Sequence, residues 1–76
     1  MGLYLSQVGQ MKQFIERMKV ELKELKSRIK KAEQAVETPP FGADKTSIDL
    51  LKSQIQYMQG YASFLEQRIE YEGGRL

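Results

Sequence analysis

The sequence predicts an all-α fold in which two helices form an antiparallel, coiled-coil-like hairpin. Three observations support this prediction: an apolar heptad pattern in the first half, a second such pattern in the second half, and a break between them that contains proline and glycine. A short connection makes two helices antiparallel neighbours. With 76 residues, the chain is expected to form a single domain.

The first predicted helix spans about residues 4–37. Its apolar residues follow one another at alternating steps of four and three, which is the spacing of a heptad repeat. A repeat of about 3.5 residues per turn predicts left-handed supercoiling against a partner helix. We call these apolar positions the seam of the helix, and they are Tyr4, Val8, Met11, Ile15, Met18, Leu22, Leu25, Ile29, Ala32 and Val36.

The predicted loop covers about residues 38–45. Pro39 disfavours a helical conformation at Thr38, and Pro40 has no amide hydrogen to continue a helix. Gly42 permits a sharp turn. Phe41 either contacts a partner or covers the open end of the hairpin, and covering the hairpin is the favoured interpretation.

The second predicted helix spans about residues 46–72, with Asp44 or Thr46 as its capping residue. Gly73 and Gly74 are expected to end it and to leave a short tail at residues 73–76. The seam of this helix also alternates steps of three and four, and consists of Ile48, Leu51, Ile55, Met58, Ala62, Leu65 and Ile69.

A second row of side chains lies about 110° around the second helix from its seam. The second row consists of Leu50, Gln54, Tyr57, Tyr61, Phe64, Arg68 and Tyr71. One partner helix cannot cover both the seam and this row, and Leu3, Leu5 and Phe14 likewise lie off the seam of the first helix. We therefore expect the hairpin to assemble into a helical-bundle homo-oligomer, a dimer or larger. The expected interface residues are Leu50, Ile55, Tyr57, Tyr61, Phe64 and Leu65. Alternatively, the tyrosines only widen the contact within one hairpin.

The composition argues against an enzyme. The chain contains no cysteine and no histidine, so thiolate chemistry, the commonest general base and the commonest metal ligand are excluded. Its carboxylates alternate with Lys and Arg on solvent-facing positions, and neither a nucleophile elbow nor a glycine-rich phosphate loop occurs. We expect no catalytic residue, no metal site and no cofactor.

No apolar run is long enough to span a bilayer, and no signal-peptide pattern opens the sequence. The expected location is the cytoplasm, which is that of the host cell if a phage encodes the protein. We expect no membrane partner.

A basic row recurs along one face of the first helix, and consists of Lys12, Lys19, Lys23, Lys26 and Lys30. It could bind phosphates, or it could be a solvated face that Glu16, Glu21 and Glu24 partly neutralise. The solvated face is the favoured interpretation, and with a net charge of +2 nucleic-acid binding is not expected.

If a nucleotide binds, Lys and Arg would contact its phosphates and tyrosines would stack on its bases. The candidate ligand residues are Lys19, Lys23, Lys26, Tyr57, Tyr61 and Arg68.

Two stretches resemble a group of short phage and prophage proteins. One is Glu24 to Ile29, which reads E-L-x-x-R-I, and the other is a pattern on the second helix. Its matching residues are Leu51, Gln54, Met58, Tyr61, Leu65, Arg68 and Ile69. This resemblance implies a phage-associated helical hairpin.

In architecture the hairpin is similar to the small oligomeric proteins that phages use as sponges for the cyclic-nucleotide signals of bacterial defence. The similarity implies an anti-defence protein that sequesters a nucleotide signal or blocks a host defence protein. The alternative is a structural coiled-coil assembly or interaction module that binds no small molecule.

Overall fold

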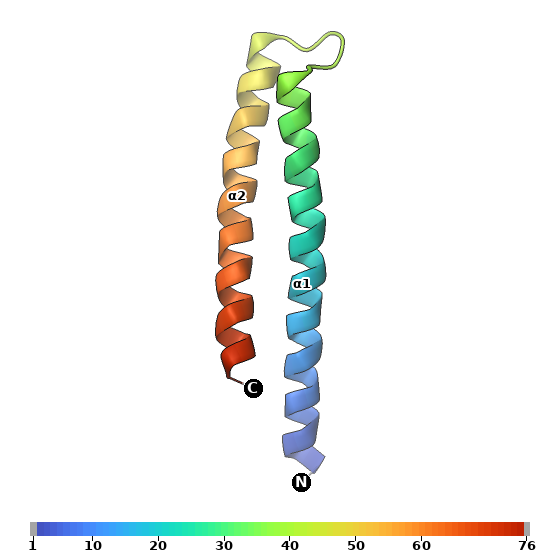
Figure 1. The fold of residues 1–76 in the computed structure, drawn as a ribbon, viewed down its shortest axis with the longest axis vertical. Helices are drawn as coiled ribbons and strands as arrows, with labels where there is room; N and C mark the ends of the chain where they lie inside the picture. The colour runs from blue at the N-terminus through green and yellow to red at the C-terminus, as the bar shows by residue number, and fades with distance from the viewer. Residues whose placement is uncertain (1, 76) are drawn as a thin grey trace.

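The computed structural model describes the backbone of residues 2–75 and the side chains of residues 9–75. It consists of two antiparallel helices packed side by side, α1 (Gly2–Glu37) and α2 (Lys45–Gly74) (Figure 1). The rod that they form measures 60 × 17 × 14 Å. The all-α hairpin predicted from the sequence is therefore confirmed.

The two helices differ in length. α1 has 36 residues and α2 has 30, so the N-terminal turns of α1 extend beyond the end of α2 (Figure 1). The side chains of the predicted seam residues Tyr4 and Val8, and of Leu3 and Leu5, lie outside the described part of the chain. Within the described residues, neither helix is long and apolar enough to cross a membrane.

The connection between the helices is fixed by local hydrogen bonds. α1 ends as the amide of Thr38 donates to the carbonyl of Gln34 at 2.8 Å, and the amide of Ala43 donates to the carbonyl of Pro40 at 3.1 Å. Gly42 has a positive φ of 89°, a conformation that disfavours any residue with a Cβ atom. Asp44 then caps α2, because its carboxylate accepts a hydrogen bond from the amide of Ser47.

The core is a single layer between the two helices. Its buried residues are Ile15, Met18, Leu25, Ile29, Ile55, Ala62 and Leu65, and every one of them is a predicted seam position. Leu65 has no exposed surface at all. Seam residues such as Leu22 and Met58 are partly buried against this layer. The heptad pattern therefore identifies the contact face of each helix, because residues spaced by threes and fours share one side of a helix.

Phe41 is fully exposed in the loop, at 109% of its reference surface. The favoured expectation that it covers the open end of the hairpin is therefore wrong. The turn at Gly42 carries the aromatic ring away from the helices, and the seam is closed near this end by Val36 and Leu51 instead.

Candidate functional site

Phe14 and Glu21 of α1 meet Tyr61 and Arg68 of α2 along one side of the hairpin, which we call the aromatic edge. The Arg68 guanidinium lies over the Phe14 ring, 5.2 Å from its centroid. The Tyr61 hydroxyl donates a hydrogen bond to a Glu21 carboxylate oxygen at 2.5 Å. Phe14 and Glu21 are seven residues apart, as are Tyr61 and Arg68, so each pair lies on one side of its helix.

The opposite side, which we call the lysine edge, brings α1 lysines against the C-terminal half of α2. The Lys26 ammonium lies 3.0 Å from a Glu66 carboxylate oxygen. Lys12 and Lys19 line an open hollow of about 460 Å³ together with Gly73. Both groups of the Lys26–Glu66 pair are more than half exposed, so their attraction is screened by water and contributes little to stability.

Four of the six candidate ligand residues fall into two groups in the structure. Lys19 and Lys26 belong to the lysine edge, whereas Tyr61 and Arg68 belong to the aromatic edge. Within each helix the residues of one edge are about 140° of helical rotation away from those of the other, as Tyr61 is from Glu66. A single hairpin therefore presents two separate surfaces, one aromatic and one basic.

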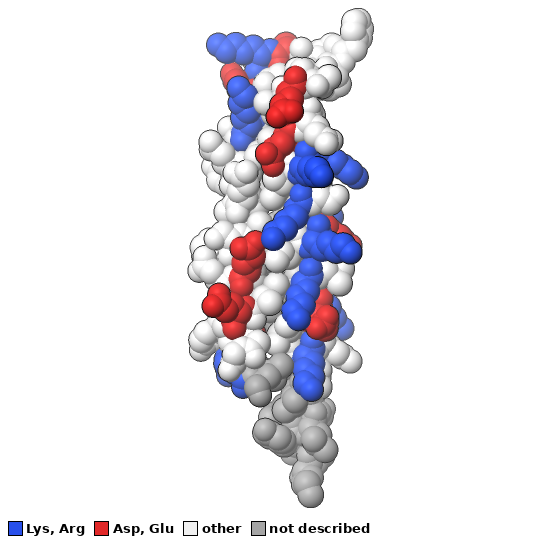
Figure 2. Space-filling model, viewed as in Figure 1, with Lys and Arg blue, Asp and Glu red and all other residues white. Residues whose placement is uncertain are grey.

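The remaining candidates are exposed. Lys23 faces solvent, and Tyr57 is 81% exposed. Lys19 also pairs with Glu16 at 3.4 Å, which partly neutralises it. Figure 2 shows the Lys and Arg side chains in a row along α1, whereas much of the neighbouring outer edge of α2 carries no charge.

The hydrogen bond to Glu21 raises the pKa of Tyr61 above its ordinary value of 10.0, and desolvation by burial acts in the same direction. The positive charge of Arg68 opposes this shift. Tyr61 is thus held as a neutral hydroxyl between an acidic and a basic neighbour. Tyr61 as a whole remains 44% exposed, so it can still be reached from solvent.

The six predicted interface residues also divide. Leu50, Tyr57, Tyr61 and Phe64 remain open to solvent, with Leu50 66% and Phe64 65% exposed. Ile55 is only 8% exposed, and Leu65 is completely covered. These two residues lie in the seam, where α1 of the same chain already packs on them. The surface that a second copy can reach is therefore the second row.

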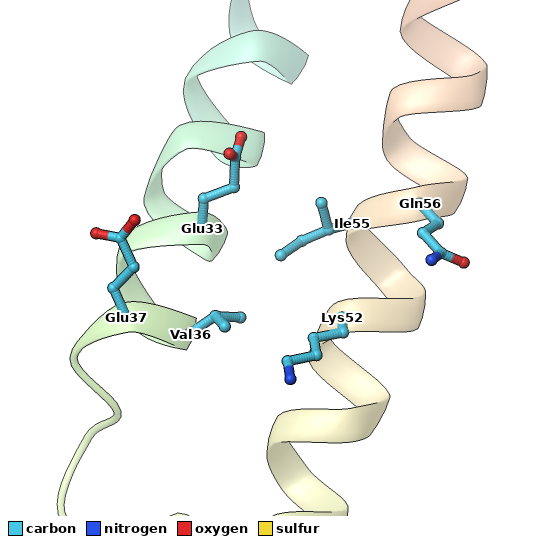
Figure 3. Close-up of a pocket in the computed structure, with 6 residues that line it drawn as sticks. All are labelled: Glu33, Val36, Glu37, Lys52, Ile55 and Gln56. Atoms are coloured by element: carbon cyan, nitrogen blue, oxygen red, sulfur yellow. The ribbon is translucent and has the colours of Figure 1, made fainter.

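A hollow of about 360 Å³ opens near the loop end of the hairpin. Val36 and Ile55 point into the space between the helices there, while Glu33 and Glu37 extend along α1 (Figure 3). Lys52 is the cation among its lining residues. With two carboxylates for one ammonium, this hollow is unfavourable for a phosphate, so the aromatic and lysine edges remain the better candidates.

Sequence reasoning missed the α1 residues that face Tyr61 and Arg68. The charge pattern alone places Glu21 among the residues that neutralise the basic row, and the apolar pattern alone places Phe14 off the seam. A signal was present, because in an antiparallel pair the positions flanking the seam on one side of each helix face each other. By that rule, the side of α1 that carries Phe14 and Glu21 faces the side of α2 that carries Tyr61 and Arg68.

The Sequestin family model matches residues 12–71, which is most of the chain. The chain belongs to the Sequestin family. The matched segment contains the first seam from Ile15 onward, the whole second seam and all six candidate ligand residues. The family name denotes sequestration, and it points to a role in binding.

No curated protein and no solved structure matches this Sequestin chain. In the part of the chain that the structure describes, no three carboxylates converge as a metal site would require.

Proposed function

We propose that this protein is a non-enzymatic, phage-type anti-defence protein that binds and sequesters a nucleotide signal. It would act by lowering the free concentration of the signal, so it needs affinity and abundance but no catalytic group. The family match supports a sequestering role, and the resemblance to phage and prophage hairpins supports the biological setting.

The observation that carries this proposal is the second row of α2, which shares Tyr61 and Arg68 with the aromatic edge. Tyr57 and Phe64 are largely exposed beside Tyr61, and Arg68 lies in the same row. An exposed aromatic ring offers a flat face on which a nucleobase can stack, and a guanidinium can bind a phosphate with two parallel hydrogen bonds. This combination fits a nucleotide better than it fits an uncharged apolar ligand.

The lysine edge is the second part of the proposal. Lys19, Lys23 and Lys26 would contribute phosphate contacts or raise the local concentration of an anionic ligand. A phosphate at Lys26 would compete with Glu66. Displacing Glu66 costs little free energy, because the pair is exposed to water.

Native mass spectrometry of the protein purified from its expression host is the first test. We expect an added mass that matches a nucleotide and is lost on denaturation. Calorimetric titration with cyclic di-AMP, cyclic GMP-AMP and cyclic AMP then tests the ligand class directly. The absence of both added mass and binding heat for these probes would contradict a cyclic-nucleotide sponge.

Variants assign the contacts. The Lys23→Glu/Lys26→Glu double variant should bind the nucleotide at least tenfold more weakly while its helicity is unchanged, as expected if each cation contributes a charge-assisted bond. Lys45→Glu/Lys52→Glu changes the net charge equally outside the basic row and is the matched control. Equal affinity in the two double variants would remove the basic row from the site.

The alternative function is a structural coiled-coil assembly or interaction module without a small-molecule ligand. The completely exposed Phe41 and the open second row favour contacts with protein. A clean oligomer without added mass, together with loss of partner binding in Phe41→Ala, would support this alternative.

A further inference from the structure

The second row of α2 has the spacing of a second coiled-coil seam. Its members follow one another at alternating steps of four and three from Leu50 to Tyr71. All of them are exposed in the hairpin, including Tyr57 at 81% and Tyr71 at 65%. α2 therefore carries two seams, one covered by α1 and one whose residues all remain exposed, although Tyr61 and Arg68 also contact the edge of α1.

We propose that a second copy of this chain covers the open seam, with the two α2 helices antiparallel. A parallel pair would place each residue beside its own copy, so that Arg68 would face Arg68 in a partly desolvated seam. An antiparallel pair separates the two arginines. Because Gln54 and Arg68 lie on either side of the middle of the row, it also brings each Gln54 near the partner's Arg68.

The spacing further specifies the register. A coiled-coil seam alternates between two heptad positions. In an antiparallel pair, a residue at one of these positions lies level with a residue at the other position on the partner. The register with the best polar matches sets Gln54 against the partner's Tyr71 and Arg68 against the partner's Tyr57. Tyr61 then packs on the partner's Phe64. A shift by seven residues instead sets Gln54 against phenylalanine and Arg68 against leucine, where neither polar group has a partner.

The surface available is sufficient for such a dimer. An aromatic side chain offers about 150–250 Å², so the exposed parts of the five apolar residues amount to roughly 600 Å² per chain. If two copies covered these parts completely, about 1,200 Å² would be buried, which is at the lower end of the range for specific interfaces. Aromatic residues and arginine are also the side chains that most often dominate binding energy at such contacts.

This pairing needs no nucleotide, so its test is carried out on the ligand-free protein and does not depend on the proposed function. The pairing uses the same aromatic row as the proposed nucleotide contacts, so a nucleotide and a second copy would compete for that row. The chain lacks cysteine, and the test uses Gln54→Cys and Tyr71→Cys variants under mild oxidation. In the proposed register either position lies roughly 25 Å from its own copy, beyond the reach of a disulfide, whereas positions 54 and 71 lie level. We expect a disulfide-linked dimer only when the two variants are mixed.

Linked dimers from either variant alone would indicate a parallel pair and overturn the proposal. An unlinked mixture would overturn the register.

Sedimentation of the native chain adds an independent measurement. Tyr57→Glu should abolish the dimer at concentrations where the native protein is dimeric, whereas Val20→Glu, which alters an exposed apolar residue of α1, should not. A native protein that stays monomeric throughout the micromolar range, or a Tyr57→Glu variant that stays dimeric, would also refute the proposal.

Discussion

Tyr61 shows at the scale of a single residue how the two helices share one surface. Its ring belongs to the second row of α2, while its hydroxyl reaches across to Glu21 of α1. Arg68 does the same through its contact with Phe14. These residues therefore link the contact within the hairpin to the face that remains open for a ligand or a second copy.

The tyrosine hydroxyl gives a prediction about alkaline pH. Because the hydrogen bond to Glu21 raises the pKa of Tyr61 above 10.0, the neutral hydroxyl stabilises the folded hairpin at pH values below 10.0. This contribution is lost as the pH rises through the folded-state pKa. In Glu21→Gln we expect the pKa of Tyr61 to fall toward its ordinary value, since the negative charge is gone.

Ring-carbon NMR during an alkaline titration checks this, with Tyr61→Phe to assign the signal. Glu24→Gln makes the same chemical change on the same helix and should leave the titration of Tyr61 as in the native chain. A midpoint that is identical in Glu21→Gln and the native chain would show that the contact with Glu21 does not control Tyr61.

At the scale of the element, α1 and α2 differ in what they leave uncovered. α1 opposes one apolar face to α2 and carries the basic row, whereas α2 has apolar side chains on two faces. One short loop separates the two helices. α2 begins after Asp44, whose carboxylate accepts a hydrogen bond from the Ser47 amide. The start of α2 therefore depends on one carboxylate.

The Asp44 cap predicts a loss of stability in acid. The hydrogen bond from the Ser47 amide lowers the pKa of Asp44 below 3.8, so the carboxylate stabilises α2 fully above that pH. The contribution disappears as the pH falls through the folded-state pKa. Asp44→Ala should lower the melting temperature at neutral pH, because the amide loses its acceptor.

Thermal unfolding followed by circular dichroism between acid and neutral pH checks the cap. Asp44→Asn is the matched control, since asparagine caps helices nearly as well and does not ionise. At neutral pH we expect Asp44→Asn to melt at nearly the same temperature as the native chain. As the pH falls, its melting temperature should change less than that of the native chain. If Asp44→Ala melts like the native chain at neutral pH, the cap does not stabilise α2.

At the scale of the whole molecule, the hairpin is a thin rod with one layer of buried side chains. The rod is 60 Å long, and the buried side chains form a core of small cross-section between the two helices. The second row is exposed to solvent on one side. A chain of this size buries too little surface to be very stable by itself. Assembly would supply the missing burial.

Stability should consequently depend on protein concentration. If the folded chain pairs and the unfolded chain does not, mass action raises the melting temperature as the protein becomes more concentrated. We expect a rise of several degrees over a hundredfold increase for the native chain, and none for Tyr57→Glu. Calorimetric scans at several concentrations measure this, and a melting temperature independent of concentration in the native chain would contradict assembly.

The sequence predicted the contact face of each helix but not the contacts across the hairpin edges. Ile15, Leu25 and Leu65 follow from the heptad pattern, because a seam depends only on spacing within one helix. The pairing of Lys26 with Glu66 depends on which turns of α1 and α2 are level. That alignment is set by the loop and by how the two seams interlock, and neither is visible in the pattern of one helix.

The sequence by itself determined that this chain is a hairpin of two helices, which residues are buried between them, and that α2 has a second apolar face. Only the structure decided that Asp44, and not Thr46, caps α2, that Phe41 is exposed, and that four candidate ligand residues divide between an aromatic and a lysine edge. The physical reason is the range of the interactions. Burial follows a period that repeats along the chain, whereas a hydrogen bond or a stacked ring needs one particular partner brought within a few ångströms.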